Sequence, residues 1–314
     1  MSGIEMKDAR KVIEEVRKVI IGKDSCSYKV MAALLARGHI LIEDIPGVGK
    51  TTMAMAFSKA MSLSQNRMQF TPDVLPSDVT GYFMYENGRF QFHKGPIFCH
   101  LFLADEINRT SPKTQSALLE VMEEGTVTVD AVTEPVPQPF LVMATQNPIG
   151  SAGTQMLPES QLDRFMIKIS IGYPSPEQEV EIMKNRHTKD PMEQVNAVVT
   201  AEEIVAMQAI VEQTYIHDLI YQYIVQLVQA TRTHEMVQLG ISPRGTLAIA
   251  KMAKANAFLK DRDYVIPDDV IDIFKDVAAH RIVLNAKARI SKVTAEQILE
   301  SILKSVKKPT AESE

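Results

Sequence analysis

The sequence has no tryptophan, only two cysteines and no apolar run that approaches the ~18 residues of a membrane helix. Cys26 and Cys99 are far apart in the chain, so neither a disulfide framework nor a zinc-binding pattern is indicated. The seven histidines also lack the spacing of metal ligands. We therefore expect no signal peptide and no membrane span, and a reducing cytoplasm as the location.

A strong excess of positive or negative charge is also lacking. The 314 residues include 34 basic and 39 acidic side chains, which gives a net charge of −5. No extended basic stripe is present, so we expect no nucleic-acid partner. A hydrophobic fraction of 45% is enough for a proper core, and the length suits one large domain or two ordinary ones.

The chain is organised around the stretch from Asp44 to Thr51, which follows an apolar run and precedes a helical pattern. A glycine-rich turn between a strand and a helix lets backbone N–H groups surround phosphate oxygens at the helix N-terminus. Lys50 would reach the β- and γ-phosphates, and the Thr51 hydroxyl would bind Mg²⁺. An ordinary strand–turn–helix connection is the alternative, and Asp44 stands where the general pattern has glycine. The predicted nucleotide-binding loop consists of Asp44, Pro46, Gly47, Val48, Gly49, Lys50, Thr51 and Thr52.

Small apolar residues before this loop are candidates for the adenine pocket. Ile21 and Gly22 lie between two helical patterns, shortly before the first predicted strand. Core packing explains them equally well.

Three predicted strands end in polar residues. The apolar run 97–104 is followed by Asp105 and Glu106, the run 140–145 by Asn147, and the run 40–42 by the loop of Lys50. Ligands of parallel sheets bind at the carboxyl ends of the strands, so these side chains should converge. With further strands at 67–70 and 166–171, alternation with helices predicts an α/β fold with a five-stranded parallel sheet.

Phosphoryl transfer assigns a role to each of these residues. Asp105 would hold Mg²⁺ with Thr51, and Glu106 would act as general base on the attacking water, which Asn147 would orient. A helix N-cap for the carboxylates and a turn position for Asn147 are the alternatives. Arg164 and Arg244 suit the charge of a γ-phosphate, although spacing does not say which does what, and surface ion pairs are the simpler interpretation.

The strand signals stop near residue 173, and the rest of the chain is helical. We therefore predict a nucleotide-binding α/β domain over residues 1–190 and a small all-α domain over residues 191–314, which the resemblance given below identifies as a lid domain. Residues 126–139 carry an alternating pattern that predicts a β-hairpin insert.

The motifs, in this order, resemble the MoxR family of AAA+ ATPases, which have the P-loop NTPase fold. The resemblance runs from about residue 20 to about residue 273. The matching blocks are 45–51, 104–109 with its Asp-Glu pair, 144–148, 157–165 and 242–244.

The resemblance implies a sheet of order 5-1-4-3-2, a helical lid and a ring that usually has six subunits. It implies that Asn147 is sensor 1, that Arg164 is an arginine finger acting on a neighbour's nucleotide, and that Arg244 is sensor 2. Residues 126–139 would be the hairpin inserted in the second helix, which faces substrate or partner.

The implied function is Mg²⁺-dependent ATP hydrolysis that drives chaperone-like remodelling of partner proteins or metal-cofactor insertion, often beside a partner with a von Willebrand factor A domain. The client protein is unknown. A magnesium-chelatase-type motor subunit and an ATP-gated scaffold with little turnover are the alternatives, although a scaffold would be expected to have lost Glu106 or Arg164. A DNA-remodelling ATPase is disfavoured because the chain is acidic.

Overall fold

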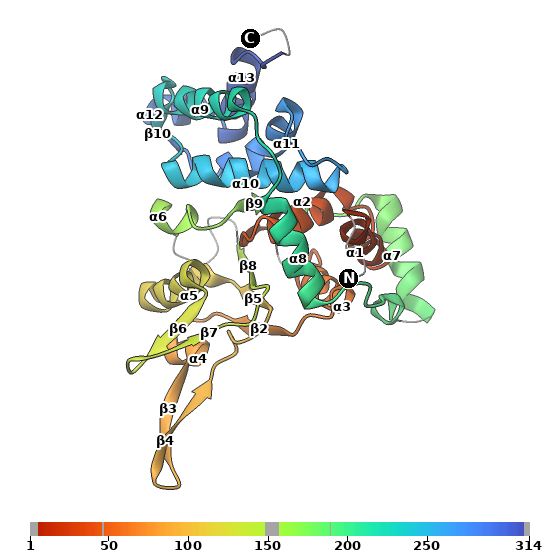
Figure 1. The fold of residues 1–314 in the computed structure, drawn as a ribbon, viewed down its shortest axis with the longest axis vertical. Coiled ribbons are helices and arrows are strands. Elements are labelled where there is room, and N and C mark those ends of the chain that lie inside the picture. Colours follow the sequence, from red (N-terminus) through yellow and green to blue (C-terminus); the bar gives the residue numbers. More distant parts are fainter. Residues whose placement is uncertain (1–5, 46, 148–156, 189, 311–314) are drawn as a thin grey trace. The chain divides into compact units, whose positions relative to one another are not determined.

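A computed structural model describes residues 6–45, 47–147, 157–188 and 190–310 (Figure 1). The chain forms two compact units. The first contains residues 1–31, 39–157 and 169–206, and the second contains residues 32–38, 158–168 and 207–314. Residues 158–168 therefore group with the helical C-terminal part of the chain. The domain boundary predicted near residue 190 stays a prediction.

A five-stranded sheet carries the fold, in the order β2-β5-β8-β1-β9. The pairings of β2 with β5, β5 with β8 and β8 with β1 are parallel. Counted along the chain, this is the order 5-1-4-3-2 that the resemblance implies, so that expectation is confirmed. The strands are β1 (Ile40–Glu43), β2 (Gln65–Gln69), β5 (Leu101–Asp105), β8 (Leu141–Gln146) and β9 (Ile167–Ile169).

The strand predicted at 97–104 begins later than its hydrophobic pattern indicates. Ile97 and Cys99 are buried, but residues 97–100 form turns in which the Cys99 amide donates to the Ile97 carbonyl at 2.8 Å. The strand starts only at Leu101, and all five residues of β5 are buried. The apolar run therefore indicated buried residues correctly, but only its second half is a strand.

Helices accompany the sheet in the first unit. α5 shows why its sequence ends where it does: Ser111 caps it, Pro112 occupies its first turn, and Gly125 ends it in the left-handed conformation at φ 66°. The helices here are α1 (Met6–Arg17), α2 (Asp24–Leu35, whose last turn belongs to the second unit), α3 (Lys50–Ala60), α4 (Pro76–Thr80), α5 (Pro112–Glu124) and α7 (Pro176–Thr188), with 3₁₀ turns at Ile107–Arg109 and Pro191–Gln194.

Two β-hairpins extend from this unit (Figure 1). β6 (Thr126–Val129) pairs with β7 (Val132–Pro135), which confirms a hairpin within residues 126–139. It follows α5 and precedes β8, however, so it does not interrupt a helix, and that part of the expectation is wrong. The connection between β2 and β5 instead holds α4 and a second hairpin, β3 (Gly81–Glu86) with β4 (Arg89–Lys94).

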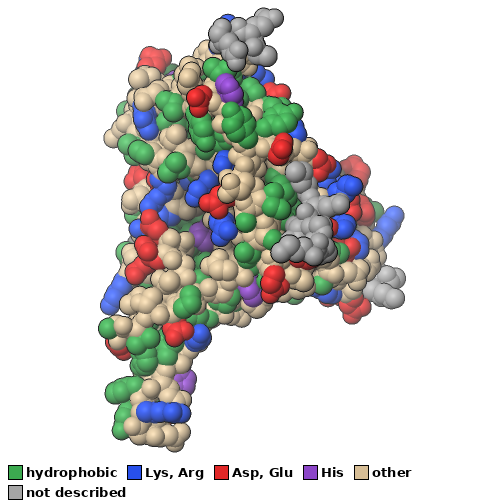
Figure 2. All heavy atoms as spheres, viewed as in Figure 1, with side chains coloured by type: hydrophobic (Ala, Val, Ile, Leu, Met, Phe, Trp, Pro, Cys, Tyr) green, Lys and Arg blue, Asp and Glu red, His purple; other side chains and the backbone are tan. Residues whose placement is uncertain are grey.

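The β3–β4 hairpin carries a row of aromatic rings on one face. Phe83 lies opposite Phe92, and Tyr85 lies opposite Phe90, with 5.2 Å between ring centroids in each pair. Tyr85 and Phe90 are 63% and 70% exposed, and Figure 2 shows hydrophobic side chains along this hairpin, which lies at the lower end of the view. Two large exposed aromatic side chains on one hairpin form an apolar surface patch.

The described part of the second unit is mainly helical, and it contains a short antiparallel pair, β10 (Val237–Leu239) with β11 (Val283–Leu284), which the sequence did not predict. Its core contains the buried rings of Tyr223, Phe258 and Phe274. A capping box formed by Thr294 and Gln297 starts its last helix. The helices are α6 (Glu159–Leu162), α8 (Ala201–Glu212, which begins in the first unit), α9 (Asp218–Thr233), α10 (Pro243–Leu259), α11 (Pro267–Ala278), α12 (Ala286–Ile290) and α13 (Ala295–Ser305). Among the described residues, no helix combines the length and the apolar character needed to cross a bilayer.

Candidate active site

The loop between β1 and α3 has the backbone that phosphate binding requires. Gly47 and Gly49 adopt left-handed conformations at φ 88° and 95°, which side chains with a Cβ rarely tolerate. A Cβ built on either glycine would meet no atom within 4 Å, so the space in front of the loop is open. α3 starts at Lys50, so the positive end of an eleven-residue helix borders this space. Pro46 lies outside the described residues.

A cleft of about 310 Å³ opens beside this loop. It collects residues from the loop after β1 and from the carboxyl ends of β5 and β8, which the sequence predicted to converge. It also includes two residues of β2, which the sequence did not predict. Its lining comprises Gly47, Gly49, Lys50, Thr51, Thr52, Arg67, Gln69, Asp105, Glu106, Thr145 and Asn147.

Lys50 is held at the edge of the loop. Its Nζ donates to the carbonyl oxygen of Asp44 at 2.9 Å. Burial lowers the pKa of Lys50, and the charges of Asp44, Asp105 and Glu106 oppose that shift. The ammonium group of a lysine at the mouth of a phosphate loop is suited to bind a polyanion.

Asp105 ends β5 and is 6% exposed. Its Oδ1 accepts a hydrogen bond from the Thr145 hydroxyl at 3.2 Å, and its Oδ2 accepts one from Nε of Arg67 at 2.6 Å. Sequence reasoning missed both partners. Thr145 had a signal, because it is a buried polar residue at the end of an apolar strand, whereas Arg67 lies in an edge strand without an apolar pattern.

Glu106 adopts a left-handed conformation at φ 56° directly after β5. Such strain in a non-glycine residue often marks a functional site. The Glu106 amide donates to the Thr145 hydroxyl at 2.9 Å. Its Oε1 accepts from Nδ2 of Asn147 at 3.1 Å, and its Oε2 accepts from Nη1 of Arg109 at 2.9 Å.

These contacts set the charge of Glu106. Burial alone would raise the pKa of the carboxyl, but the hydrogen bonds from Arg109 and Asn147 and the charge of Lys50 outweigh it and lower the pKa. The carboxylate is therefore the form present near neutral pH, as a general base requires. The Oδ1 of Asn147 is buried and has no hydrogen-bond partner among the described residues, which leaves an acceptor for a bound donor such as water.

The residues present fit Mg²⁺ bound together with a nucleotide. Thr51 and Asp105, the two predicted ligands, both line the cleft. Among the described residues, no group of three or more histidine, cysteine or acidic side chains could hold a metal by itself. A hydroxyl and one carboxylate, completed by phosphate oxygens and water, are the usual surroundings of Mg²⁺ in nucleotide sites.

Asp44 does not line the cleft, although the sequence predicted it to bind the cofactor. Its Oδ2 accepts hydrogen bonds from the hydroxyl of Ser170 and the amides of Ile171 and Gly172, at 3.1, 2.6 and 2.8 Å. Its Oδ1 accepts from the Ile45 amide at 3.2 Å. The carboxylate thus ties the start of the phosphate loop to the chain that follows β9.

A second cavity, of about 520 Å³, shares Gly47, Gly49 and Thr52 with the cleft. Ile21 and Val48 line it, whereas Gly22 does not. Gly22 packs under the side chain of Gln178, where a Cβ would have no room. A largely apolar cavity next to a phosphate loop suits an adenine ring, and that role of Ile21 stays a prediction.

Arg164 and Arg244 belong to the second unit. Arg164 follows α6, and Arg244 lies in the first turn of α10, directly after Pro243. Their predicted roles toward a nucleotide stay predictions.

Comparison with known proteins agrees with this geometry. Residues 39–167 match the family model of the ATPase family associated with various cellular activities, and residues 229–302 match that of the AAA lid domain. Chaperone MoxR1 of Mycobacterium tuberculosis is 40% identical over 97% of this chain and 83% of its own length. The chain belongs to the MoxR family of AAA+ ATPases.

Two further proteins match nearly the whole chain. The uncharacterized protein YeaC of Bacillus subtilis is 47% identical over 96% of this chain and 95% of its own. A crystal structure from Cytophaga hutchinsonii, of a protein assigned as an ATPase, is 38% identical with a TM-score of 0.91 and covers 97% of this chain and 96% of that one. The fold described above is therefore that of an AAA+ ATPase domain with an AAA lid domain.

Proposed function

We propose that this MoxR-family protein binds ATP with Mg²⁺ and hydrolyses it. The observation that carries the proposal is the hydrogen bond between Glu106 and Asn147 within the cleft that also contains Lys50. Water activation needs a deprotonated carboxylate and a polar group that orients the water beside the bound phosphates. Glu106 and Asn147, which are hydrogen-bonded to each other beside the phosphate loop, suit these two tasks.

Each residue has a part in this reaction. The loop amides and Lys50 bind the phosphates, and Thr51 and Asp105 hold Mg²⁺, which when bound neutralises charge on the phosphate oxygens. Glu106 polarises the attacking water, and Asn147 holds that water through its open amide oxygen. The lowered pKa of Glu106 supports this role, because the carboxylate needs no prior deprotonation.

We further propose that the active protein is a ring, with six subunits the expected number. Arg164 would act on the nucleotide of a neighbouring subunit, and Arg244 would sense the nucleotide of its own subunit. The support is chemical: a guanidinium stays charged and binds phosphate oxygens with two N–H groups.

The work done by hydrolysis would be remodelling of partner proteins or assistance in metal-cofactor insertion. The chaperone name of the mycobacterial relative supports this, and so does the exposed aromatic surface of the β3–β4 hairpin, which suits contact with a polypeptide. A partner with a von Willebrand factor A domain and a cytoplasmic location belong to the same proposal. Among the described residues, Cys26 and Cys99 form no disulfide, which agrees with that location.

The test is ATP turnover per subunit as a function of protein concentration, for the wild type, Glu106→Gln and Arg164→Ala. Glu120→Gln and Arg289→Ala serve as matched controls, because both side chains are exposed and neither lines the cleft. We expect turnover per subunit to rise with concentration in the wild type and in both controls. Glu106→Gln should bind ATP but lose turnover by at least roughly a hundredfold.

Three results would change the proposal. Turnover that is independent of concentration and survives loss of Arg164 would remove the shared site. Binding of ATP without turnover would favour a nucleotide-gated scaffold. Turnover that appears only with a chelatase partner would favour the magnesium-chelatase-type motor.

A further inference from the structure

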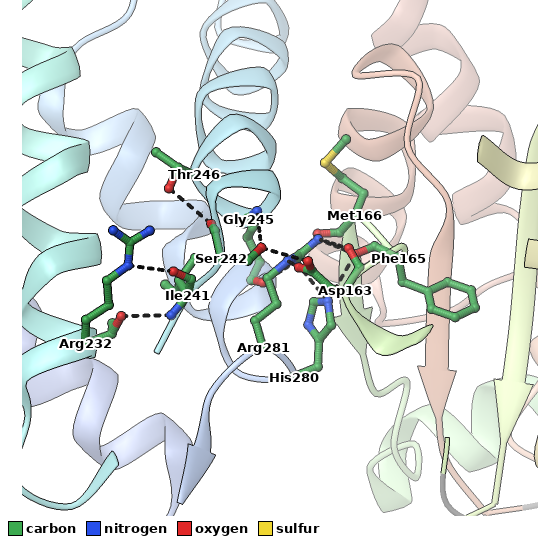
Figure 3. A network of polar contacts seen from close by, with 12 residues as sticks. Asp163, Phe165, Met166, Arg232, Ile241, Ser242, Gly245, Thr246, His280 and Arg281 are labelled. Atoms are coloured by element: carbon green, nitrogen blue, oxygen red, sulfur yellow. Dashed lines mark hydrogen bonds and ion pairs between the residues drawn. The ribbon is translucent and has the colours of Figure 1, made fainter. Parts of the chain in front are cut away.

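The buried side chain of Arg281 binds the turn that carries Arg164 (Figure 3). Arg281 is 6% exposed. Its Nη2 donates to the carbonyl oxygens of Asp163 and Phe165, at 3.1 and 2.6 Å, and its Nη1 donates to that of Met166 at 3.1 Å. Carbonyl groups on both sides of Arg164 are therefore held by the same guanidinium.

The carboxylate of Asp163 extends this contact to another helix. Its Oδ1 accepts from Nε of Arg281 at 2.8 Å, and its Oδ2 accepts from the hydroxyl of Ser242 at 2.7 Å (Figure 3). The same hydroxyl accepts from the Gly245 amide at 3.1 Å and so caps α10. Because Arg244 lies in that first turn, Asp163 joins the turn of one predicted nucleotide-contacting arginine to the helix start of the other.

Packing and charge also link the first turn of α10 to the side chain of Arg281. A Cβ at position 245 would lie 2.8 Å from Cδ of Arg281, so the stem of Arg281 occupies the space that Gly245 leaves in the first turn of α10. Burial lowers the pKa of Arg281, Asp163 raises it, and the positive charge of Arg244 lowers it further. Arg244 is thus close enough for its charge to act on the linkage.

Support of the fold alone would explain only part of this arrangement. A buried arginine that binds carbonyl groups stabilises the turn whatever α10 does. The bond from Ser242 to Asp163 is a separate connection, because α10 would keep its cap without it. That bond connects the first turn of α10 to the Arg164 turn, so it can couple the positions of the two.

We propose that Ser242, Asp163 and Arg281 form a linkage that makes Arg164 and Arg244 move as one block. A change sensed by Arg244 at the subunit's own nucleotide would then alter the position of Arg164 at the neighbour's nucleotide. The inference rests on the proposed function, which assigns those two roles. Ser242, Asp163 and Arg281 are positioning residues, since they act on a nucleotide only through the two arginines.

The test uses Ser242→Ala, because removal of the buried Arg281 could unfold the unit. Thr294→Ala is the matched control. The Thr294 hydroxyl accepts from the Gln297 amide and so caps α13 in the same unit, but α13 has no such bond to Asp163 among the described contacts. Ser242→Thr keeps the hydroxyl and should therefore behave like the wild type. For each full-length protein, hydrogen exchange of residues 158–168 is measured with and without the ATP analogue AMP-PNP and Mg²⁺. Affinity for a fluorescent ATP analogue and ATP turnover are measured beside it.

In the wild type, Thr294→Ala and Ser242→Thr, we expect the nucleotide to slow exchange of residues 163–167. In Ser242→Ala this response should disappear, while nucleotide affinity changes less than about threefold and turnover falls roughly tenfold or more, because the finger is misplaced. A full response in Ser242→Ala, or no response in a wild type that binds nucleotide, would overturn the linkage and leave the ATPase proposal standing. A wild type that binds no nucleotide would remove the proposed function, and the linkage with it.

Discussion

Asn147 donates a hydrogen bond from Nδ2 to Oε1 of Glu106 at 3.1 Å, and so connects the ends of β8 and β5. This bond orients the carboxylate, while the amide oxygen of Asn147 stays available to water. Two polar side chains from neighbouring strands thus meet in the cleft. The proposed chemistry depends on this pair more than on any other contact.

Asn147→Ala should lower kcat roughly tenfold to a hundredfold and leave ATP affinity within about twofold. The reason is that Asn147 acts on Glu106 and the water, not on the bound phosphates. Steady-state turnover and direct nucleotide binding separate the two effects, with Asn66→Ala, an exposed change in β2, as control. An increase in KM at constant kcat would instead assign Asn147 to substrate binding.

The hydrogen bond from Arg109 to Glu106, at 2.9 Å, predicts a pH effect. Turnover requires the Glu106 carboxylate, so activity should rise as the pH passes upward through the pKa of Glu106. Burial raises that pKa, but Arg109, Asn147 and Lys50 lower it below the ordinary value. Arg109→Ala removes one of the lowering contacts, so the acid limb of kcat/KM should move to higher pH. Arg109→Lys, which keeps the charge, should move it less, and an unchanged limb in Arg109→Ala would contradict the assignment of Glu106 as the base.

Arg67 binds the same carboxylate that Mg²⁺ would use, with 2.6 Å between Nε of Arg67 and Oδ2 of Asp105. The arginine and the metal therefore compete for negative charge. Arg67→Ala should lower the Mg²⁺ concentration that half-saturates nucleotide binding by roughly two- to fivefold, the scale of one half-exposed ion pair. Arg67→Lys should stay near the wild type. If Arg67→Ala needs more Mg²⁺ than the wild type, Arg67 supports the metal site instead of competing with it.

Lys50, Thr51, Asp105, Glu106 and Asn147 could be predicted from sequence because each follows an apolar strand, and parallel strands bring their carboxyl ends to one edge. Arg67 could not. It lies in β2, where three of five residues are exposed, so no hydrophobic pattern distinguished its ligand-facing side chain from a surface charge.

The hairpins show a different limit. Alternation predicted a hairpin within residues 126–139, but a strand pattern does not say which core elements a hairpin separates. That information requires knowing which strands form the five-stranded sheet: along the chain, β3–β4 rather than β6–β7 then lies between the core strands β2 and β5.

Asp44→Ala should cost about 2–4 kcal/mol of unfolding free energy, because it leaves the buried amide of Ile171 and the partly buried amide of Gly172 without their carboxylate partner. Sequence reasoning assigned Asp44 to the nucleotide because of its place in the loop, and its actual partners lie 126 to 128 residues further along the chain. Urea unfolding measures the loss, and Asp24→Asn, which removes an exposed ion pair with Arg17, should cost no more than about 0.5 kcal/mol. Equal stability of Asp44→Ala and the wild type would show that the tether contributes nothing to the folded state.

His39 gives the protein a predictable loss of stability in acid. The ring is buried between α5 and β8: Nδ1 accepts from the Val142 amide at 3.0 Å, which leaves Nε2 to donate to the Met122 carbonyl at 2.8 Å. Burial lowers the pKa of His39 to about 4, against 6.5 for the ordinary side chain. The unfolded chain therefore binds the proton first. The contribution of His39 is complete above about pH 6.5 and is lost progressively as the pH falls toward 4, by about 3 kcal/mol in total.

His39→Gln should be less stable than the wild type at pH 8, because the glutamine amide cannot reproduce both bonds of the ring. Its unfolding free energy should fall less steeply between pH 6.5 and 4, because it no longer carries the group whose protonation favours the unfolded chain. Urea unfolding of both proteins at several pH values isolates this difference, since all other titrating groups are shared. Parallel pH profiles would show that another group, and not the buried His39 ring, controls acid unfolding.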